Sequence, residues 1–103
     1  MVKRISAADA KARTDAGQSL LVCIYDDDKF TSQAHLDGAI PMSEFLKKKP
    51  TLSKETNIIF YWGWTNDSSA AGLAAQYFKD GYTGASILDK GINGWKAAGF
   101  KML

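Results

Sequence analysis

With 103 residues, 46% of them apolar and 23% charged, the chain has room for one hydrophobic core and the composition of a globular domain. A formal net charge of +2 argues against the clustered basic surface that nucleic-acid binding requires. No apolar run approaches the ~20 residues of a membrane span. We therefore expect a single domain over residues 1–103 that binds neither nucleic acid nor a membrane.

The compartment is only weakly constrained by the sequence. The chain opens with Met1-Val2-Lys3-Arg4 and no apolar signal-peptide core follows. Its single cysteine, Cys23, has no second cysteine with which to form an internal disulfide. The cytoplasm is the default expectation, although a targeting segment removed from the chain would leave no trace in the sequence.

The first predicted elements are a helix and a buried strand. Ser6 followed by Asp9 is an N-cap signal, and Gly17 ends the helix-favouring stretch, which predicts a helix over residues 6–16. Residues 20–25 form an apolar, β-branched run, typical of a strand covered on both faces. Three aspartates then end the strand.

The next predicted segments are mostly loop, followed by a short helix. Residues 29–33 are a candidate turn of helix, and the glycine and proline of residues 35–41 mark a loop that closes with a brief extended piece. Residues 42–49 predict a helix whose last turn carries Lys47–Lys49, where cations suit the helix dipole. An anion-attracting patch is the alternative interpretation of these lysines.

The second half of the chain predicts a strand, a polar turn and a helix, and then a further strand and helix. Residues 58–61 are a short buried strand, and residues 69–78 are a helix closed by Gly81. Residues 85–88 predict another buried strand, and residues 91–99 a turn into the last helix. Strands that alternate with helices imply a parallel sheet between helical layers, with ligands bound where strands end.

Several segments resemble the single-domain rhodanese-like family. Residues 88–99, Leu-Asp-Lys-Gly-Ile-Asn-Gly-Trp-Lys-Ala-Ala-Gly, are similar to the family's closing strand, glycine turn and tryptophan-bearing helix. Residues 34–40, Ala-His-Leu-Asp-Gly-Ala-Ile, are similar to its Gly-His-Ile-x-Gly-Ala-Ile segment. The likeness covers nearly the whole chain, and it implies a rhodanese-like three-layer α/β/α fold with a central, mainly parallel sheet.

The resemblance also implies where the active-site loop lies. The family's enzymes carry sulfane sulfur as a persulfide on a cysteine that directly follows the tyrosine of the central strand. Here that position is Trp62, and indole offers neither a thiolate nor a nucleophilic substitute. We therefore expect no catalytic residue, cofactor or metal in the loop equivalent, which comprises Trp62, Gly63, Trp64, Thr65, Asn66, Asp67, Ser68 and Ser69.

Other departures from the family's pattern point the same way. The usual loop ends near an arginine that helps to hold an anionic donor, whereas Asp67 would repel one. Cys23 and Tyr25 stand approximately where the family has the aspartate and arginine of the early strand. The loop is one residue longer than the commonest sulfurtransferase form, closer to the fold's phosphatase relatives, but phosphatases need the same cysteine.

Four other chemical readings of the sequence have simpler structural alternatives. Cys23 lies in an apolar strand, where a thiol is usually buried and inert, and His35 has no ligand partner at metal-binding spacing. Asp26–Asp28 lack the pattern of a calcium loop and indicate a solvated turn. Ser68 and Ser69 have no identifiable base, and an N-cap at Asp67, Ser68 or Ser69 explains the cluster without chemistry.

Trp62 and Trp64 leave two interpretations open. Paired tryptophans in a loop could anchor a binding partner, because indole is enriched at interface centres. Alternatively, one or both fold inward and fill the vacated pocket. The sequence favours neither.

Three functional hypotheses follow. The leading one is a rhodanese-like domain without sulfurtransferase activity that acts as a binding or regulatory module for an unknown protein partner or a small anion. The second is a thiosulfate-type sulfurtransferase in a form with Trp62 in place of the nucleophile, since cysteine and tryptophan codons differ by one base. In the third, backbone N–H groups of residues 63–68 form a nest for a small anion.

Overall fold

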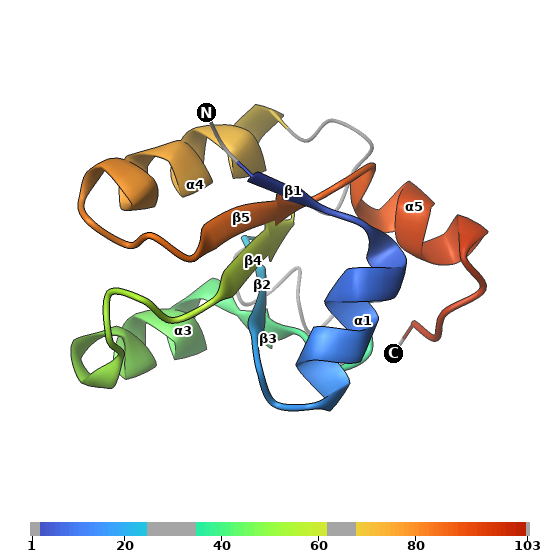
Figure 1. The fold of residues 1–103 in the computed structure, drawn as a ribbon. Coiled ribbons are helices and arrows are strands. Elements are labelled where there is room, and N and C mark those ends of the chain that lie inside the picture. The colour runs from blue at the N-terminus through green and yellow to red at the C-terminus, as the bar shows by residue number, and fades with distance from the viewer. Residues whose placement is uncertain (1–2, 25–34, 62–67, 103) are drawn as a thin grey trace.

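The computed structural model describes residues 3–24, 35–61 and 68–102. Its strands are β1 (Lys3–Ile5), β2 (Leu20–Cys23), β3 (Ile40–Pro41), β4 (Ile58–Tyr61) and β5 (Ala85–Leu88). Its helices are α1 (Ala7–Asp15), α3 (Met42–Lys48), α4 (Ser68–Lys79) and α5 (Gly91–Ala97), with a 3₁₀ turn, η1 (Lys49–Thr51), after α3. The strands form one parallel sheet in the order β1-β5-β4-β2-β3 (Figure 1).

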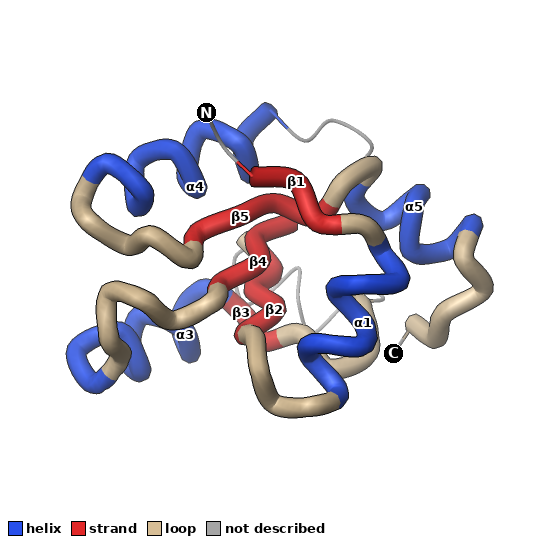
Figure 2. The backbone as a smooth tube through the Cα atoms, in the orientation of Figure 1, coloured by secondary structure: helices blue, strands red, loops and turns tan. Residues whose placement is uncertain are grey.

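Two helices cover each face of the sheet, so the predicted three-layer α/β/α architecture is confirmed (Figure 2). Alternate side chains of each strand point to opposite faces. In β4, Ile59 and Tyr61 face the core under α1 and α5, whereas Ile58 and Phe60 face the core under α3 and α4. All four β4 side chains are at most 1% exposed, which makes β4 the buried centre of the sheet.

The early elements lie close to their predicted positions. The predicted helix over residues 6–16 is α1, and the Ser6 hydroxyl accepts a hydrogen bond from the Asp9 N–H at 3.2 Å, as the N-cap signal indicated. The strand predicted for residues 20–25 ends at Cys23, and its last three residues are buried. The predicted turn of helix at residues 29–33 lies outside the described residues.

The later elements are confirmed as well. The short lysine-ended helix is α3, and the brief extended piece before it is β3. After α4, Gly81 adopts a φ of 100°, and the Tyr82 N–H donates to the Tyr77 carbonyl at 3.0 Å. This bond closes a Schellman motif, the left-handed helix cap that Gly81 predicted.

One strand of the sheet was not predicted. β1 has three residues, of which only Ile5 is buried, while Lys3 and Arg4 are exposed. Such a short charged segment shows neither an apolar run nor clear alternation, so its strand character comes from pairing with β5, where Ile5 lies beside Leu88. Among the described residues, no helix has the length and apolar character needed to cross a membrane.

Candidate functional site at the carboxyl edge of the sheet

The candidate site lies where the central strand ends. Cys23, the last residue of β2, pairs in register with Tyr61, the last residue of β4, and the Ile24 N–H donates to the Tyr61 carbonyl at 3.1 Å. The next described residue after Tyr61 is Ser68, which begins the twelve-residue helix α4. Residues 62–67 therefore join the carboxyl end of the most buried strand to the amino end of a long helix.

The topology also makes this edge a favoured place for a ligand. β4 leads to α4, which packs on one face of the sheet, whereas the adjacent strand β5 leads to α5, which packs on the other. Chain segments that leave neighbouring strands toward opposite faces open a crevice at the carboxyl edge of a parallel sheet. The predicted loop thus begins beside a topological switch point.

The interior of the predicted loop is not part of the described structure. Trp62, Gly63, Trp64, Thr65, Asn66 and Asp67 lie outside the described residues. The two interpretations of the tryptophans and the anion nest of residues 63–68 therefore stay predictions. Ser68 and Ser69 are helical residues in the first turn of α4. Tyr25 and Asp26–Asp28 also lie outside the described part.

Cys23 and His35 take different positions beside this edge. The Cys23 side chain is 0% exposed and belongs to the core under α1 and α5, which confirms the expected buried thiol. His35 is half-buried and precedes the fully buried Leu36. No group of three or more His, Cys, Asp or Glu side chains among the described residues could hold a metal ion.

A contact that the sequence did not suggest fixes the tip of the Tyr61 side chain. The Leu36 N–H donates a hydrogen bond to the Tyr61 hydroxyl at 3.2 Å, and both residues are at most 1% exposed. The only sequence signal was an aromatic side chain with a polar tip at the end of an apolar run, since such a hydroxyl usually finds a partner when buried. The partner itself, 25 residues away, had no local signal.

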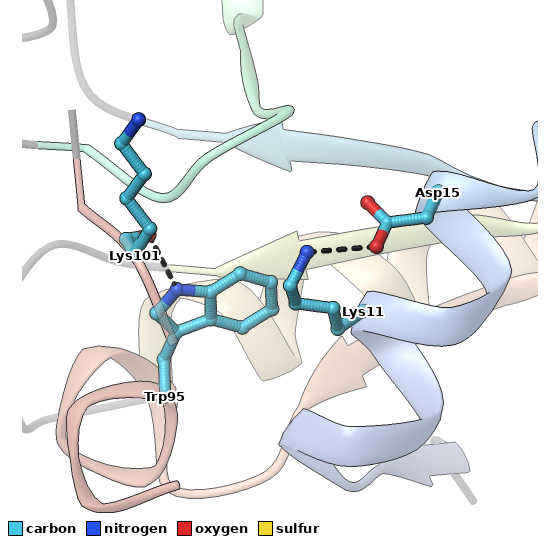
Figure 3. Close-up of polar contacts among 4 residues, drawn as sticks. All are labelled: Lys11, Asp15, Trp95 and Lys101. Atoms are coloured by element: carbon cyan, nitrogen blue, oxygen red, sulfur yellow. Dashed lines mark hydrogen bonds and ion pairs between the residues drawn. The ribbon is translucent and has the colours of Figure 1, made fainter. Parts of the chain in front are cut away.

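The segment after α5 joins the same region. The Trp95 indole Nε1–H donates to the Lys101 carbonyl at 2.9 Å (Figure 3). The Asp37 N–H donates to the same carbonyl at 3.2 Å, and Leu36 forms an antiparallel bridge with Met102. Residues 100–102, which we call the strap, therefore connect the tryptophan-bearing helix to the segment that holds Tyr61.

Lys11 places a charged side chain of α1 beside the strap. Its ammonium group donates to the Asp15 carboxylate at 2.7 Å (Figure 3) and lies 5.9 Å from the centre of the Phe100 ring. The hydrogen bond to Asp15 is the main cause that raises the pKa of Lys11, with smaller Coulombic contributions from Asp15 and Asp37. A positive charge is thus held where α1, the strap and residue 37 approach one another.

The chain belongs to the rhodanese-like family. The family's sequence profile, described as Rhodanese-like domain, matches residues 6–98. The resemblance noted in the sequence is thereby confirmed, and the five-stranded parallel sheet with its flanking helices is a rhodanese-like fold. No curated protein matches the sequence.

Solved structures show the same fold. The thiosulfate sulfurtransferase of Pseudomonas aeruginosa is 26% identical with a TM-score of 0.79, covering 99% of this chain and 20% of that chain. The Alr3790 protein of Anabaena sp. is 20% identical with a TM-score of 0.77, covering 94% of this chain and 79% of that chain. The BH2092 protein of Bacillus halodurans is 23% identical with a TM-score of 0.75, covering 98% of this chain and 76% of that chain. This chain therefore spans about a fifth of the length of the sulfurtransferase.

Proposed function

We propose that this rhodanese-like domain lacks sulfurtransferase activity and serves as a binding or regulatory module, with the loop of residues 62–69 as its contact surface. The observation that carries the proposal is Trp62, which directly follows the last residue of β4, where the family's resemblance places the persulfide cysteine. An indole cannot form a persulfide, because that intermediate needs a thiolate.

The position of Cys23 supports this proposal. It is the chain's only thiol, and its side chain is 0% exposed in the core. A sulfur donor would have to reach it through packed side chains, so Cys23 is poorly suited to replace the missing nucleophile.

The first test is sulfur transfer from thiosulfate to cyanide. We expect the parent protein to be inactive and to gain no sulfur atom by intact-mass measurement after incubation with thiosulfate. The Cys23→Ala variant controls for transfer through the buried thiol. Turnover by the parent would contradict the inactive assignment, and its loss in Cys23→Ala would show that the buried thiol carries the sulfur.

The second test addresses binding. A protein retained from cell extract by the parent and lost by the double variant Trp62→Ala/Trp64→Ala is a candidate partner, whose affinity is then measured with purified components. We expect the double substitution to weaken that affinity at least about tenfold, because tryptophans at interface centres often contribute 2 kcal/mol or more. Unchanged affinity would show that the loop is not the contact surface. Titration with sulfate or phosphate, followed through backbone amide resonances of residues 63–68, tests a small anion as ligand.

The alternative function is a thiosulfate-type sulfurtransferase represented by a form with Trp62 in place of the nucleophile. The similarity to a thiosulfate sulfurtransferase over 99% of this chain favours it. On this hypothesis, Trp62→Cys restores a persulfide and thiosulfate turnover, limited by the missing arginine. A Trp62→Cys protein that folds like the parent and accepts no sulfur would exclude this alternative and strengthen the binding-module proposal.

A further inference from the structure

Five lysines lie in the segments that form the amino edge of the sheet, opposite the candidate site. Helices between parallel strands return the chain to this edge, so α3 and α4, which precede β4 and β5, both end there (Figure 1). The two entry segments are joined, because the Thr83 N–H donates to the Lys54 carbonyl at 2.9 Å. We call the five side chains the lysine surface, which comprises Lys47, Lys48, Lys49, Lys54 and Lys79.

Aromatic rings hold two of these ammonium groups in place. The Lys54 ammonium lies 4.0 Å from the centre of the Tyr82 ring and donates to the Asp80 carbonyl at 3.1 Å. The Lys49 ammonium lies 4.9 Å from the centre of the Tyr77 ring and 5.8 Å from that of Tyr82. The two tyrosine rings pack on each other with centroids 5.4 Å apart. Because ring faces attract cations, two positive charges are held close together over one buried aromatic pair.

Carboxylates do not neutralise the charge of the lysine surface. Among the described residues, none of the five lysines forms an ion pair with an Asp or Glu side chain. The Asp80 carboxylate accepts instead from the Gln76 amide at 3.2 Å, and Glu44 and Glu55 are exposed. Unpaired charges of one sign on one surface produce a positive potential that attracts anionic groups.

The same two helices carry exposed apolar side chains. Leu46 on α3 and Phe78 on α4 are each 48% exposed, and each directly precedes a lysine of the lysine surface. Each also follows a buried aromatic residue, and these two residues, Phe45 and Tyr77, meet with ring centroids 5.7 Å apart. The exposed pair therefore comes from the place where α3 and α4 pack together. A free anion would use only the lysines, whereas a polypeptide can contact the apolar side chains as well.

We propose that the lysine surface binds an acidic segment of a partner protein, whose carboxylates meet the lysines and whose apolar side chains contact Leu46 and Phe78. Complementary charge speeds the encounter with such a segment and disfavours partners of the wrong charge. This surface lies at the edge opposite the loop of residues 62–69, so it is a second contact site and does not depend on the first.

A membrane fits this surface less well than an acidic polypeptide. Binding to an anionic bilayer needs a continuous apolar helix face that enters the lipid. In α3 the Phe45 side chain is completely buried in the core, which leaves Leu46 as the exposed large apolar side chain of that helix. Glu44, Glu55 and Asp80 lie in the same segments and would be repelled by anionic lipid.

The first experiment titrates a glutamate-rich peptide that contains leucine into the ¹⁵N-labelled parent protein. We expect the amide resonances of residues 46–54 and 76–83 to shift. The affinity should fall at least about tenfold as salt rises from about 0.05 to about 0.5 M, because salt screens exposed charges. A lysine-rich peptide with the same leucines should not bind. A glutamate-rich peptide that shifts no resonance, or shifts those of another surface, would overturn the proposal.

The second experiment reverses charges on the protein. Lys47→Glu/Lys48→Glu changes two exposed side chains and leaves the ammonium groups over the tyrosine rings in place. We expect it to weaken peptide binding at least about tenfold. Lys96→Glu/Lys101→Glu is the matched control, because it makes the same change in net charge in α5 and the strap, and its affinity should stay near that of the parent. Equal losses in both proteins would overturn the proposal.

A further variant covers a failure of the first one to fold. Lys79→Glu reverses one exposed charge at the end of α4 and should weaken binding at least about threefold, with Lys96→Glu as its control. If Lys47→Glu/Lys48→Glu does not fold, this pair of variants decides by the same criterion.

Other ligands are tested on the same surface. Leu46→Ala/Phe78→Ala should weaken peptide binding at least about threefold, and an unchanged affinity would overturn the apolar contact. Inorganic phosphate that shifts the same resonances with the same affinity as the peptide would overturn the choice of a polypeptide. Vesicles of phosphatidylserine and phosphatidylcholine that bind the parent, lose it on Lys47→Glu/Lys48→Glu and are not displaced by the peptide would assign the surface to a membrane and likewise overturn the proposal.

Discussion

Gly84 directly precedes β5, where its backbone approaches the backbone of residues 56 and 57, just before β4, too closely to leave room for a side chain. A Cβ atom at Gly84 would lie 2.3 Å from the Thr56 carbonyl oxygen and 3.0 Å from the Asn57 Cα atom. The approach is part of the sheet's construction, since the Ile58 N–H donates to the Gly84 carbonyl at 3.0 Å. Glycine is needed here for space, because the neighbouring atoms are backbone and cannot rotate away.

Replacing Gly84 therefore tests this close approach. Gly84→Ala should lower the free energy of unfolding by about 1–3 kcal/mol, the usual cost of forcing extra atoms into a packed site. Gly72→Ala is the matched control, because Gly72 lies within α4 and a Cβ there would meet nothing within 4 Å. That substitution should stabilise the protein by about 0.5–1 kcal/mol through better helix propensity. Urea unfolding of both variants checks the two signs, and equal stabilities would contradict the contact at residue 84.

At the scale of elements, the sequence predicted those whose signals are local. β2 and β4 are continuous apolar runs, β5 is a short apolar run interrupted only by Ser86, and α1 and α4 end at glycines that allow a left-handed cap. β1 escaped prediction because three residues with one buried side chain carry no periodic signal. The position of the candidate loop could be predicted from the strand before it, β4, and the helix after it, α4. The partner of the Tyr61 hydroxyl did not, because contacts between distant segments depend on the completed fold.

The pair formed by Lys11 and Asp15 within α1 predicts a pH dependence of stability. The pKa of Lys11 is raised from its ordinary value of 10.5, chiefly by the hydrogen bond to Asp15. The folded state therefore holds this proton more tightly than the unfolded state. The stabilisation that protonated Lys11 gives is fully present below the pKa that Lys11 has in the unfolded state. It is lost as the pH rises through the higher pKa that Lys11 has in the folded state.

Urea unfolding of the parent and of Lys11→Met, from neutral pH to about pH 11.5, measures this effect. The difference in unfolding free energy between the two proteins should stay constant up to about pH 10 and then decrease. In an Asp15→Asn background the decrease should be smaller, because the main cause of the raised pKa is gone. A difference that grows with alkaline pH would reverse the sign of the linkage and contradict the pairing.

Across the whole molecule, the two faces of the sheet have different kinds of core. The face under α1 and α5 contains the buried rings of Trp95 and Tyr61. The Trp95 indole N–H donates a hydrogen bond to the Lys101 carbonyl, and the Tyr61 hydroxyl accepts one from the Leu36 N–H. The other face contains a cluster of four aromatic rings that joins α3 and α4 to the sheet. Its members are Phe45, Phe60, Tyr77 and Tyr82. The first face thus combines packing with hydrogen bonds between distant segments, whereas the second contributes mainly packing.

Phe45 tests how far the protein depends on the second face. Its ring is 0% exposed and meets Phe60 at 5.6 Å and Tyr77 at 5.7 Å between centroids, so it packs α3 on both the sheet and α4. Phe45→Ala should cost about 3–5 kcal/mol of unfolding free energy. A domain of this size has only about 5–15 kcal/mol in total, so the variant should unfold at much lower urea concentration or fail to fold.

Leu46 gives the matched control, because it is the next residue of α3 and is 48% exposed. Leu46→Ala should change the unfolding free energy by no more than about 0.5 kcal/mol, since little packing is lost and alanine suits a helix. Urea midpoints and slopes for the parent and both variants separate the two positions. Equal destabilisation by both would mean that α3 contributes through its exposed side as well. A Phe45→Ala protein as stable as the parent would show that the aromatic cluster does not hold α3 to the sheet.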